Sequence, residues 1–234
     1  MRLKKITIPR NAAARRRYDD ACAAAHALDL VGDRWALLVM RELMMGPKRF
    51  SDLREGLPGI SANVLTQRLE ELEVVGVLTR HRLPPPTSAQ VYELTAWGYE
   101  AEPVLQALGR WAARSPAHDP TLPLSTTSFL LSLRTMIDPA RAAGIDALVG
   151  LRLDGETFLA RLRQGAIAIT RDAPAGADVV FTASAAVLAR AIYGGAPLQG
   201  LEASGELRVE GDHALAERFI TLFPLPPKAD QPKA

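Results

Sequence analysis

The stretch GPKRFSDLREGLPGISANVLTQRLEELEVVGVLTRHRL, Gly46 to Leu83, places two short amphipathic segments and one basic segment in close succession. Phe50 to Leu57 is predicted to form a short helix, because it is bounded by Gly-Pro before it and by the turn-forming sequence LPGIS after it. Ser61 is predicted to cap a longer helix that follows. A short helix, a tight turn and a longer helix are typical of a helix-turn-helix unit.

The predicted longer helix has two chemically different faces. One face is apolar, with the i, i+4, i+7 spacing of a buried stripe, formed by Leu65, Leu69 and Leu72. The opposite face is polar and carries Asn63, Thr66, Gln67 and Glu70. In a helix-turn-helix protein such a face enters the major groove of DNA, where a side-chain amide can pair with adenine. A plain helical bundle with exposed amides of no function fits the spacing equally well.

The residues after this helix predict a β-hairpin. Val77 to Leu83 has β-type and basic residues, PPPTS forms a rigid loop, and Gln90 to Thr95 alternates as a returning strand. A hairpin after a recognition helix is a wing, whose basic side chains contact the DNA backbone or minor groove. This second feature favours the DNA-binding interpretation over the bundle. The residues predicted to contact DNA are Arg49, Ser61, Asn63, Thr66, Gln67, Arg68, Arg80 and Arg82.

Helices are also predicted on either side of this core. Asp20 to Val31 is an alanine-rich segment, and Asp33 is predicted to cap a helix that ends at Gly46-Pro47. Thr95 to Ala113 is predicted to be a closing helix with a kink at Pro103. Its apolar residues outnumber what a small winged domain can cover, which predicts a partner subunit.

Length and composition indicate two globular domains. The chain has 234 residues, 48% of them hydrophobic and 23% charged, with a net charge of +2. Proline-rich sequence interrupts the periodic pattern after the closing helix and predicts an interdomain linker. The predicted organisation is a basic N-terminal arm at 1–19, a winged helix-turn-helix domain at 20–114, a linker at 115–124, a second domain at 125–224 and a disordered tail at 225–234.

The chain has neither a membrane-spanning apolar run of about 20 residues nor a signal peptide, so no membrane insertion and a cytoplasmic location are expected. Residues 1–17 contain seven basic groups and no acid, as expected of an arm that neutralises phosphates, although a solvated tail explains this composition equally well.

After the linker, the pattern changes from helices to strands. Ser125 to Ile137 and Pro139 to Ala147 are predicted helices, and Val149 to Asp172 alternates around Asp154-Gly155 and Gln164-Gly165, which are hairpin turn signals. Further segments predict a strand at 177–183, a helix at 184–193, a short last strand and a last helix from Asp212. The fold class is therefore α+β, with an antiparallel sheet covered by helices after the winged domain.

The N-terminal residues resemble a known family. The segments ALDLVGDRWALLVMREL, GPKRFSDLREGLPGISANVLTQRLEELEVVGVL and YELTAWGYEAEPVLQALGRWA are similar to the HxlR family of bacterial winged helix-turn-helix regulators, which are related to MarR-type repressors. The resemblance covers about residues 20–113 and implies a homodimer that binds a pseudo-palindromic site on double-stranded DNA. Many relatives carry a further basic residue just before the returning strand, where this chain has Ser88-Ala89-Gln90, so wing affinity is expected to depend on Arg80 and Arg82.

Cys22 lies near the position of a cysteine that is common in that family and that senses oxidants or electrophiles in some members. It is the candidate redox sensor, with a buried structural cysteine as the alternative. Asp19 and Asp20 are expected to raise the pKa of its thiol, and His26, four residues on, is expected to offset them.

The C-terminal residues resemble the sterol-carrier-protein-type lipid-binding domain over about residues 125–224. The resemblance is carried by LDGETFLARLRQGAIAITRDAPAGADVVFTASAAVLARAIYGG and GELRVEGDHALAERFITLFP, and it implies an apolar tunnel for a small apolar or lipid ligand. Ordinary core packing explains apolar residues at these spacings as well. The candidate ligand-binding residues are Phe158, Leu162, Ile167, Ile169, Phe181, Leu188, Ile192, Phe219 and Phe223.

No catalytic motif, cofactor-binding loop or metal-ligand spacing occurs in the sequence, so an enzyme is not expected and no cofactor or metal is predicted. The favoured function is a dimeric DNA-binding transcriptional regulator, most consistent with a repressor, tuned by a small apolar ligand in the second domain. The alternative is a lipid carrier or scaffold in which the winged domain serves only for dimerisation.

Overall fold

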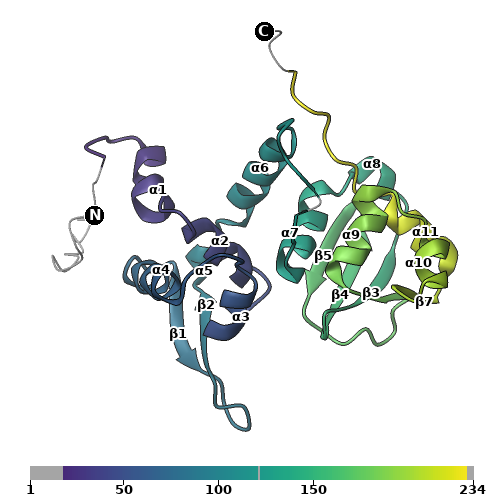
Figure 1. Ribbon diagram of the computed structural model, residues 1–234, viewed down its shortest axis with the longest axis horizontal. Coiled ribbons are helices and arrows are strands. Elements are labelled where there is room, and N and C mark those ends of the chain that lie inside the picture. The colour runs from purple at the N-terminus through teal and green to yellow at the C-terminus, as the bar shows by residue number, and fades with distance from the viewer. Residues whose placement is uncertain (1–17, 121, 231–234) are drawn as a thin grey trace.

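The computed structural model describes residues 18–120 and 122–230, and residues 1–17 of the predicted basic arm lie outside this part of the chain. Figure 1 shows two lobes side by side, each with its own core. The N-terminal lobe has the order of a winged helix-turn-helix domain. Its elements are α1 (Ala23–Val31), α2 (Ala36–Leu43), α3 (Phe50–Glu55), α4 (Ala62–Val74), β1 (Leu78–Arg82), β2 (Gln90–Leu94), α5 (Ala96–Tyr99) and α6 (Glu102–Ala113).

The predicted helix-turn-helix is confirmed at α3 and α4. Ser61 caps α4, because its hydroxyl oxygen accepts a hydrogen bond from the Val64 backbone N–H at 3.3 Å. The apolar face of α4 is completely buried in the core of this lobe by Leu65, Leu69 and Leu72. Burial of that face orients the polar side of the helix outward.

The wing is the antiparallel pair of β1 and β2, with Leu78 opposite Leu94 and Arg82 opposite Gln90. The wing is extended by an isolated bridge, in which the backbone N–H and C=O of Lys48 bond to Tyr92 at 3.0 and 2.9 Å. Lys48, two residues before the start of α3, is thereby attached to the returning strand of the wing.

Several predicted helices differ from the structure. The predicted segment from Asp20 is helical only from Ala23, and the helix predicted from Pro139 to Ala147 ends at Ala142, with Ala147 in a strand. The second helix starts at Ala36 rather than next to Asp33, because Trp35 adopts a left-handed conformation with φ of 80° and takes the N-cap position. The predicted closing helix is divided into α5 and α6, and Pro103 lies in the first turn of α6 instead of kinking one long helix. A proline is well tolerated there, because the first turn has no N–H partner to lose.

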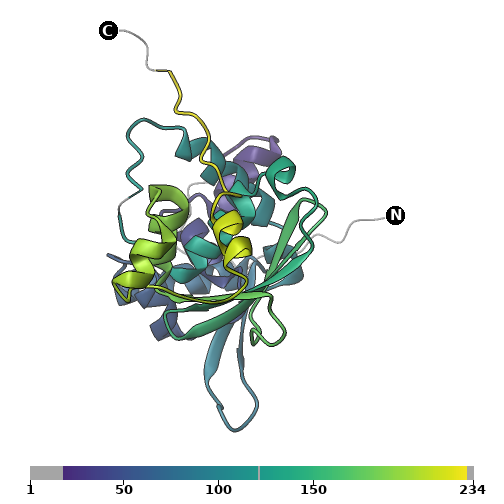
Figure 2. The ribbon, with the colours of Figure 1, turned by 90° about the vertical axis from the view of Figure 1, so that its right-hand side faces the viewer.

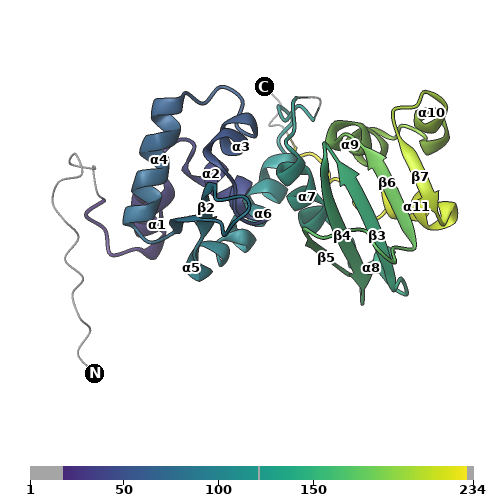
Figure 3. The same ribbon diagram turned by 90° about the horizontal axis from the view of Figure 1, so that it is seen from below.

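The C-terminal lobe consists of a five-stranded sheet with helices (Figure 3). Its elements are α7 (Thr126–Met136), α8 (Pro139–Ala142), β3 (Ala147–Leu153), β4 (Glu156–Arg163), β5 (Ala166–Thr170), β6 (Val179–Ala183), α9 (Ala185–Gly194), α10 (Leu198–Ala203), β7 (Arg208–Gly211) and α11 (His213–Ile220). Of these, α10 was not predicted from the sequence.

Both predicted hairpin turns are confirmed. Asp154 and Gly155 have φ of 51° and 83°, and Gln164 and Gly165 have φ of 52° and 76°. Positive φ at both central residues defines a two-residue turn whose twist matches that of the strands. The turns join β3 to β4 and β4 to β5 with one continuous register.

The prediction of a purely antiparallel sheet is wrong. The strand order is β5-β4-β3-β6-β7, and β3 pairs with β6 in parallel. The segment between β5 and β6 crosses the sheet over β3, where a Cβ at Gly150 would lie 2.5 Å from Cβ of Pro174, so glycine leaves room for the crossing. Alternating burial is the same in parallel and antiparallel strands, so the sequence pattern does not distinguish the two.

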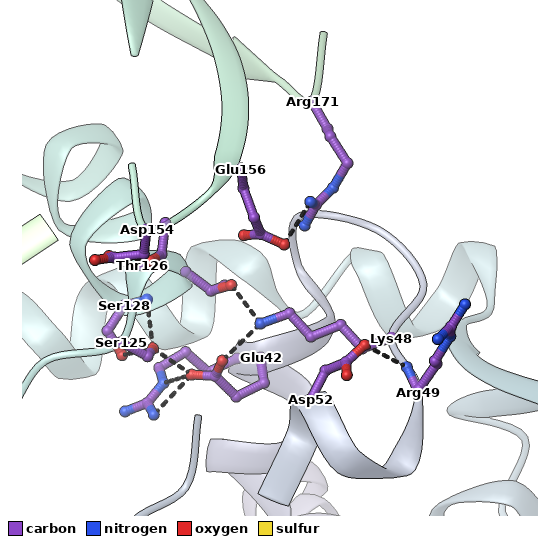
Figure 4. A network of polar contacts seen from close by, with 12 residues as sticks. Glu42, Lys48, Arg49, Asp52, Ser125, Thr126, Ser128, Asp154, Glu156 and Arg171 are labelled. Atoms are coloured by element: carbon purple, nitrogen blue, oxygen red, sulfur yellow. Dashed lines mark hydrogen bonds and ion pairs between the residues drawn. The ribbon is translucent and has the colours of Figure 1, made fainter. Parts of the chain in front are cut away.

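A buried polar network joins the two lobes (Figure 4). Glu42 of α2 is fully buried, and its carboxylate accepts hydrogen bonds from Arg41, from Lys48 Nζ at 2.9 Å and from Ser125 Oγ at 2.6 Å. Lys48 Nζ also donates to Thr127 Oγ1 at 2.8 Å. Ser125 caps α7 and Thr127 lies in its first turn, so the C-terminal lobe satisfies a buried ion pair of the winged domain.

Further contacts extend this junction along α6 and α7. The Arg134 guanidinium binds both carboxylate oxygens of Glu102, at 3.0 and 2.9 Å. Arg110 donates to the carbonyl oxygen of Thr135. Met45 and Ala113 of the winged lobe pack into the apolar core of the C-terminal lobe. The two lobes therefore share both polar and apolar contacts, and none of the helices in the described residues is long and apolar enough to cross a membrane.

The start of the predicted disordered tail is ordered against the end of α6. Lys228 Nζ donates to the carbonyl oxygens of Ala113 and Ser115 at 3.1 and 3.0 Å, and the Ala229 N–H bonds to Arg114. A lysine ammonium at a helix C-terminus satisfies carbonyls that have no partner in the helix. Residues 225–230 thus differ from the prediction because tertiary contacts supply partners that their composition does not suggest.

The buried network predicts a large effect of removing the Glu42 charge. Glu42→Gln leaves the Lys48 ammonium buried without a counter-charge, so the free energy of unfolding should fall by about 3–5 kcal/mol. Glu217→Gln, at an exposed position of α11, is the matched control and should change stability little. Chemical denaturation followed by circular dichroism measures both variants, and equal stability of the two would contradict the role assigned to Glu42.

Candidate nucleic-acid interface

The outer face of α4 presents polar side chains to solvent. Asn63, Thr66 and Gln67 are all exposed, as predicted, and they lie within the first two turns of the helix. Ser61 is exposed at the start of the same helix. Its oxygen accepts the capping bond, which leaves the hydroxyl proton available to a phosphate.

The two amides on this face differ in how free they are. Gln67 Nε2 donates to Glu71 Oε1 one turn further along α4 at 3.1 Å. Asn63 has no hydrogen bond to any other residue that the structure describes. A bidentate contact to adenine requires both the N–H and the C=O of the amide, so Asn63 can make it at once while Gln67 must first release Glu71.

The prediction that Arg68 contacts DNA is contradicted. Arg68 is 8% exposed, and its Nη1 lies 2.5 Å from Asp33 Oδ2 and 2.7 Å from Glu71 Oε2. By distance these two contacts are ion pairs, although their angles are not those of regular hydrogen bonds. The Nε atom of Arg68 has no hydrogen-bond partner among the described residues. Arg68 therefore connects α4 to the turn before α2 and faces inward, because it follows the buried Leu65 by three residues.

The wing carries two arginines of unequal accessibility. Arg80 Nε lies 3.8 Å from Glu73 Oε2 of α4, with half of its side chain exposed. Arg82 is exposed and has no ion pair with another described residue. Arg49 is exposed just before α3, where its backbone N–H bonds to Asp52 at 3.2 Å. These three guanidinium groups are exposed at the wing and at the start of α3, and they can neutralise phosphates.

Arg34 is a further cation near this surface that the sequence reasoning missed. It lies over the ring of Trp35 at 5.4 Å, and that ring is close to Gly59 in the turn before α4. A basic residue next to an aromatic residue between two predicted helices was the only available signal. The left-handed conformation of Trp35, which directs the ring to this turn, is a tertiary feature.

The C-terminal lobe leaves the outer face of α4 uncovered. In Figures 1 and 3, α4 lies at the far side of the winged lobe, while α7 contacts the opposite side through α2 and α6. Among the described residues, the C-terminal lobe therefore leaves accessible the surface that the sequence assigns to DNA.

The candidate ligand-binding residues of the second domain lie mostly in its packed core. Seven of the nine are buried there, and three aromatic rings pack in series, with centroid distances of 5.5 Å from Phe181 to Phe219 and 5.1 Å from Phe219 to Phe223. Two of the nine candidates, Ile192 and Phe223, are among the residues that line a depression of about 290 Å³. Ile167 and Ile192 are partly buried. The buried residues are Phe158, Leu162, Ile169, Phe181, Leu188, Phe219 and Phe223.

Cys22 is exposed at the position just before α1. The backbone N–H groups of Ala25 and then of Ala24 lower the pKa of the Cys22 thiol from its ordinary value. The sulfur makes no regular capping hydrogen bond, so the effect is that of the positive end of the helix. The expected increase from Asp19 and Asp20 is wrong, because the pKa is lowered by the backbone N–H groups even though the Asp20 carboxylate lies nearby and accepts a hydrogen bond from the Cys22 N–H at 2.9 Å.

Comparison with known proteins agrees with this geometry for the N-terminal lobe. Residues 30–119 match the family described as HxlR-like helix-turn-helix. The HTH-type transcriptional regulator YodB of Bacillus subtilis is 40% identical over 86 residues, which are 37% of this chain and 77% of that protein. YvaP of the same species is 37% identical, with 80% of its length covered. A regulator of Synechocystis sp. is 41% identical, and the chain spans 64% of its length.

A structure described as the reduced form of YodB has 35% sequence identity and a TM-score of 0.38, and it covers 43% of this chain and 100% of that one. Residues 117–229 match the family described as Alkyl sulfatase C-terminal, so the sterol-carrier resemblance of this lobe stays a prediction. With its recognition helix, its wing and relatives matched over most of their length, the chain belongs to the HxlR-like helix-turn-helix family.

Proposed function

We propose that the protein is a dimeric transcriptional regulator that binds double-stranded DNA through α4 and the wing, and that it acts as a repressor. The proposal depends on one observation, which is the exposed amide face of α4, left free by the C-terminal lobe. Asn63 and Gln67 are assigned to base edges in the major groove. Ser61, Thr66, Arg49, Arg80 and Arg82 are assigned to the phosphate backbone.

An apolar stripe on α6 supports the dimer. Val104, Leu108 and Trp111 follow the i, i+4, i+7 spacing and are 55, 42 and 74% exposed. Leu28 of α1 is a further apolar residue with more than half of its surface exposed. Exposed apolar residues on one helix face are typical of a protein–protein interface. We propose that a second copy of the chain covers this stripe. The resulting dimer presents two recognition helices, one for each half of a pseudo-palindromic site.

The dimer proposal predicts the effect of Trp111→Ser. A buried tryptophan at an interface contributes about 2 kcal/mol or more, so the dimer dissociation constant should rise about 30-fold or more. Leu122→Ser, at an exposed leucine before α7, is the control and should leave the dimer intact. Analytical ultracentrifugation over a dilution series measures both constants, and a wild-type chain that sediments as a monomer at all concentrations rules out the dimer.

The ligand part of the proposal concerns the C-terminal lobe. A small apolar ligand requires space that the aromatic residues now occupy, so binding must open the core or use the depression at Ile192 and Phe223. The alternative is a lipid carrier or scaffold. Steep loss of duplex affinity with salt supports the regulator, because it reports counterion release, and negligible duplex affinity supports the carrier.

The DNA-binding proposal predicts unequal effects of two alanine variants. Each bidentate amide–adenine contact contributes about 1–3 kcal/mol, so Asn63→Ala and Gln67→Ala should both weaken binding to a duplex selected by the wild-type protein from random sequences. Asn63→Ala should cost more, because the Gln67 amide must first leave Glu71. Fluorescence anisotropy gives the two affinities.

Gln199→Ala is the control for these variants, since this amide is exposed on α10 of the other lobe. Unchanged affinity in both α4 variants would show that the groove-facing side of α4 is assigned incorrectly.

A second candidate function, redox sensing, is favoured by the exposure and lowered pKa of Cys22. A larger thiolate fraction at neutral pH makes a cysteine more reactive toward oxidants and electrophiles. α1 is a short helix next to α2 and also carries the exposed Leu28, so modification at its start acts close to the proposed dimer surface.

This observation predicts the pH dependence of Cys22 alkylation. Because the folded pKa is lowered, the thiolate forms at lower pH, and the iodoacetamide rate should reach half of its maximum below the value for the unfolded chain, which is about 8.5. The same rate curve in denaturant is the control, since unfolding removes the helix amides. Coincidence of the folded and unfolded curves is the outcome that removes the redox proposal.

A further inference from the structure

One face of the C-terminal sheet carries none of the helices of the described residues, and the segment between β5 and β6 crosses it at Gly150. The core-facing positions of β4 are Phe158, Ala160 and Leu162, all fully buried. Alternate residues of a strand point to opposite faces, so Arg161 and Arg163 point to the other side of the sheet. With residues of the neighbouring strands they form the open face, on which the arginines are Arg152, Arg161, Arg163 and Arg208, with side chains 44, 52, 64 and 73% exposed.

The charge on this open face is only partly neutralised. Arg152 and Arg208 share Glu210, at 2.5 and 3.0 Å. Arg161 and Arg163 share Asp146, at 3.9 and 3.7 Å, which are longer than hydrogen-bond distances. Asp178, at the start of β6, is a further acid at the rim, and its carboxylate accepts the Leu148 N–H at 2.7 Å. The four arginines of the face therefore meet three carboxylates, and Asp178 lies next to Leu148, the residue opposite Arg161 in the pairing of β3 with β4. Among these groups the face keeps an excess of one positive charge.

On the β5 side, small neighbours leave these two arginines accessible, while on the β3 side Arg161 lies opposite Leu148. In the pairing of β4 with β5, Arg161 lies opposite Ala168 and Arg163 lies opposite Ala166. Cross-strand neighbours share a face, and a methyl group cannot cover an arginine side chain. An accessible guanidinium presents a planar set of donors that fits a phosphate group.

The open face is turned to the same side of the molecule as the wing. Figure 2 shows α9 and α11 above the sheet and the hairpin of β1 and β2 extending below it. Figure 3 looks from that lower side and shows the strands in front of the helices, with β5 next to the winged lobe and β7 farthest from it. The contacts of α7 with α2 and α6 hold the sheet in this position.

We infer that the open face is a second DNA contact, in which Arg161 and Arg163 bind phosphates of the duplex that flanks the site occupied by α4 and the wing. This inference rests on the proposed function, because it requires α4 and the wing to bind DNA first. The contact is independent of base sequence, since exposed arginines on a flat sheet reach the backbone and not the groove edges. It extends the bound segment outward on both sides of a dimer.

The inference is tested with duplexes of two lengths. The shorter duplex holds only the sequence selected by the wild-type protein from a random pool, and the longer one adds about one helical turn, roughly 10 base pairs, at each end. Each neutralised phosphate adds about 0.9 to the magnitude of the slope of log affinity against log salt concentration. A dimer has four such arginines, Arg161 and Arg163 of each subunit, so the wild-type slope should be steeper by about 3 to 4 on the longer duplex than on the shorter one.

Arg161→Gln combined with Arg163→Gln should abolish this difference and leave the slope on the shorter duplex unchanged. The matched control is Arg190→Gln combined with Arg218→Gln, which removes the same charge from the exposed surfaces of α9 and α11. The control should keep the length dependence, because these helices lie on the opposite face of the sheet.

Two outcomes overturn the inference: equal slopes of the wild-type protein on both duplexes, or a length dependence that survives in the Arg161/Arg163 variant. A parallel loss in that variant and in the control reports net charge alone and also overturns it. Failure of the proposed function looks different, since the wild-type protein then selects and binds no duplex at all.

Discussion

The arrangement of the two lobes depends on a single buried carboxylate. Glu42 has lost all contact with water, and such a group is stable only if donors fill its lone pairs. Those donors come from Arg41, Lys48 and Ser125, and so from both lobes. Glycine at position 56 allows the close approach, because a Cβ there would lie 2.5 Å from a Glu42 carboxylate oxygen. The position of α7, and with it of the whole sheet, follows from this requirement.

This junction connects the C-terminal lobe to the wing and to the helix-turn-helix, which carry the proposed DNA contacts. Lys48 contacts Thr127 of α7 through its ammonium group and Tyr92 of the wing through its backbone, and α3 begins two residues later. Any displacement of α7 therefore acts on the wing and the helix-turn-helix together. If a ligand in the C-terminal lobe is to change the affinity for DNA, a structural element must connect the two sites and make different contacts in the ligand-bound and ligand-free states. α7 has the position that such an element requires. The exposed stripe of α6 lies next to the same helix, which brings the proposed dimer surface into the same unit.

Much of the winged lobe could be predicted from local sequence. The cap at Ser61, the leucine stripe of α4 and the strands of the wing all agree with the prediction, because each depends on residues within a few positions of each other. The errors arose where distant residues meet. Arg68 faces Asp33 instead of DNA, and Cys22 precedes α1 instead of lying inside it. In the second lobe, seven candidate ligand residues pack into the core, because apolar spacing is the same for a core and for a tunnel wall.

The sequence by itself determined the two domains, the helix-turn-helix and both tight turns of the second sheet, because periodicity and turn chemistry are local properties of the chain. Tertiary structure decided the parallel pairing of β3 with β6 and the junction at Glu42. It also decided that the open face of the sheet turns toward the wing. These features depend on contacts between residues far apart in the chain, where many pairings satisfy the same pattern and only close packing and the pairing of buried charges select one.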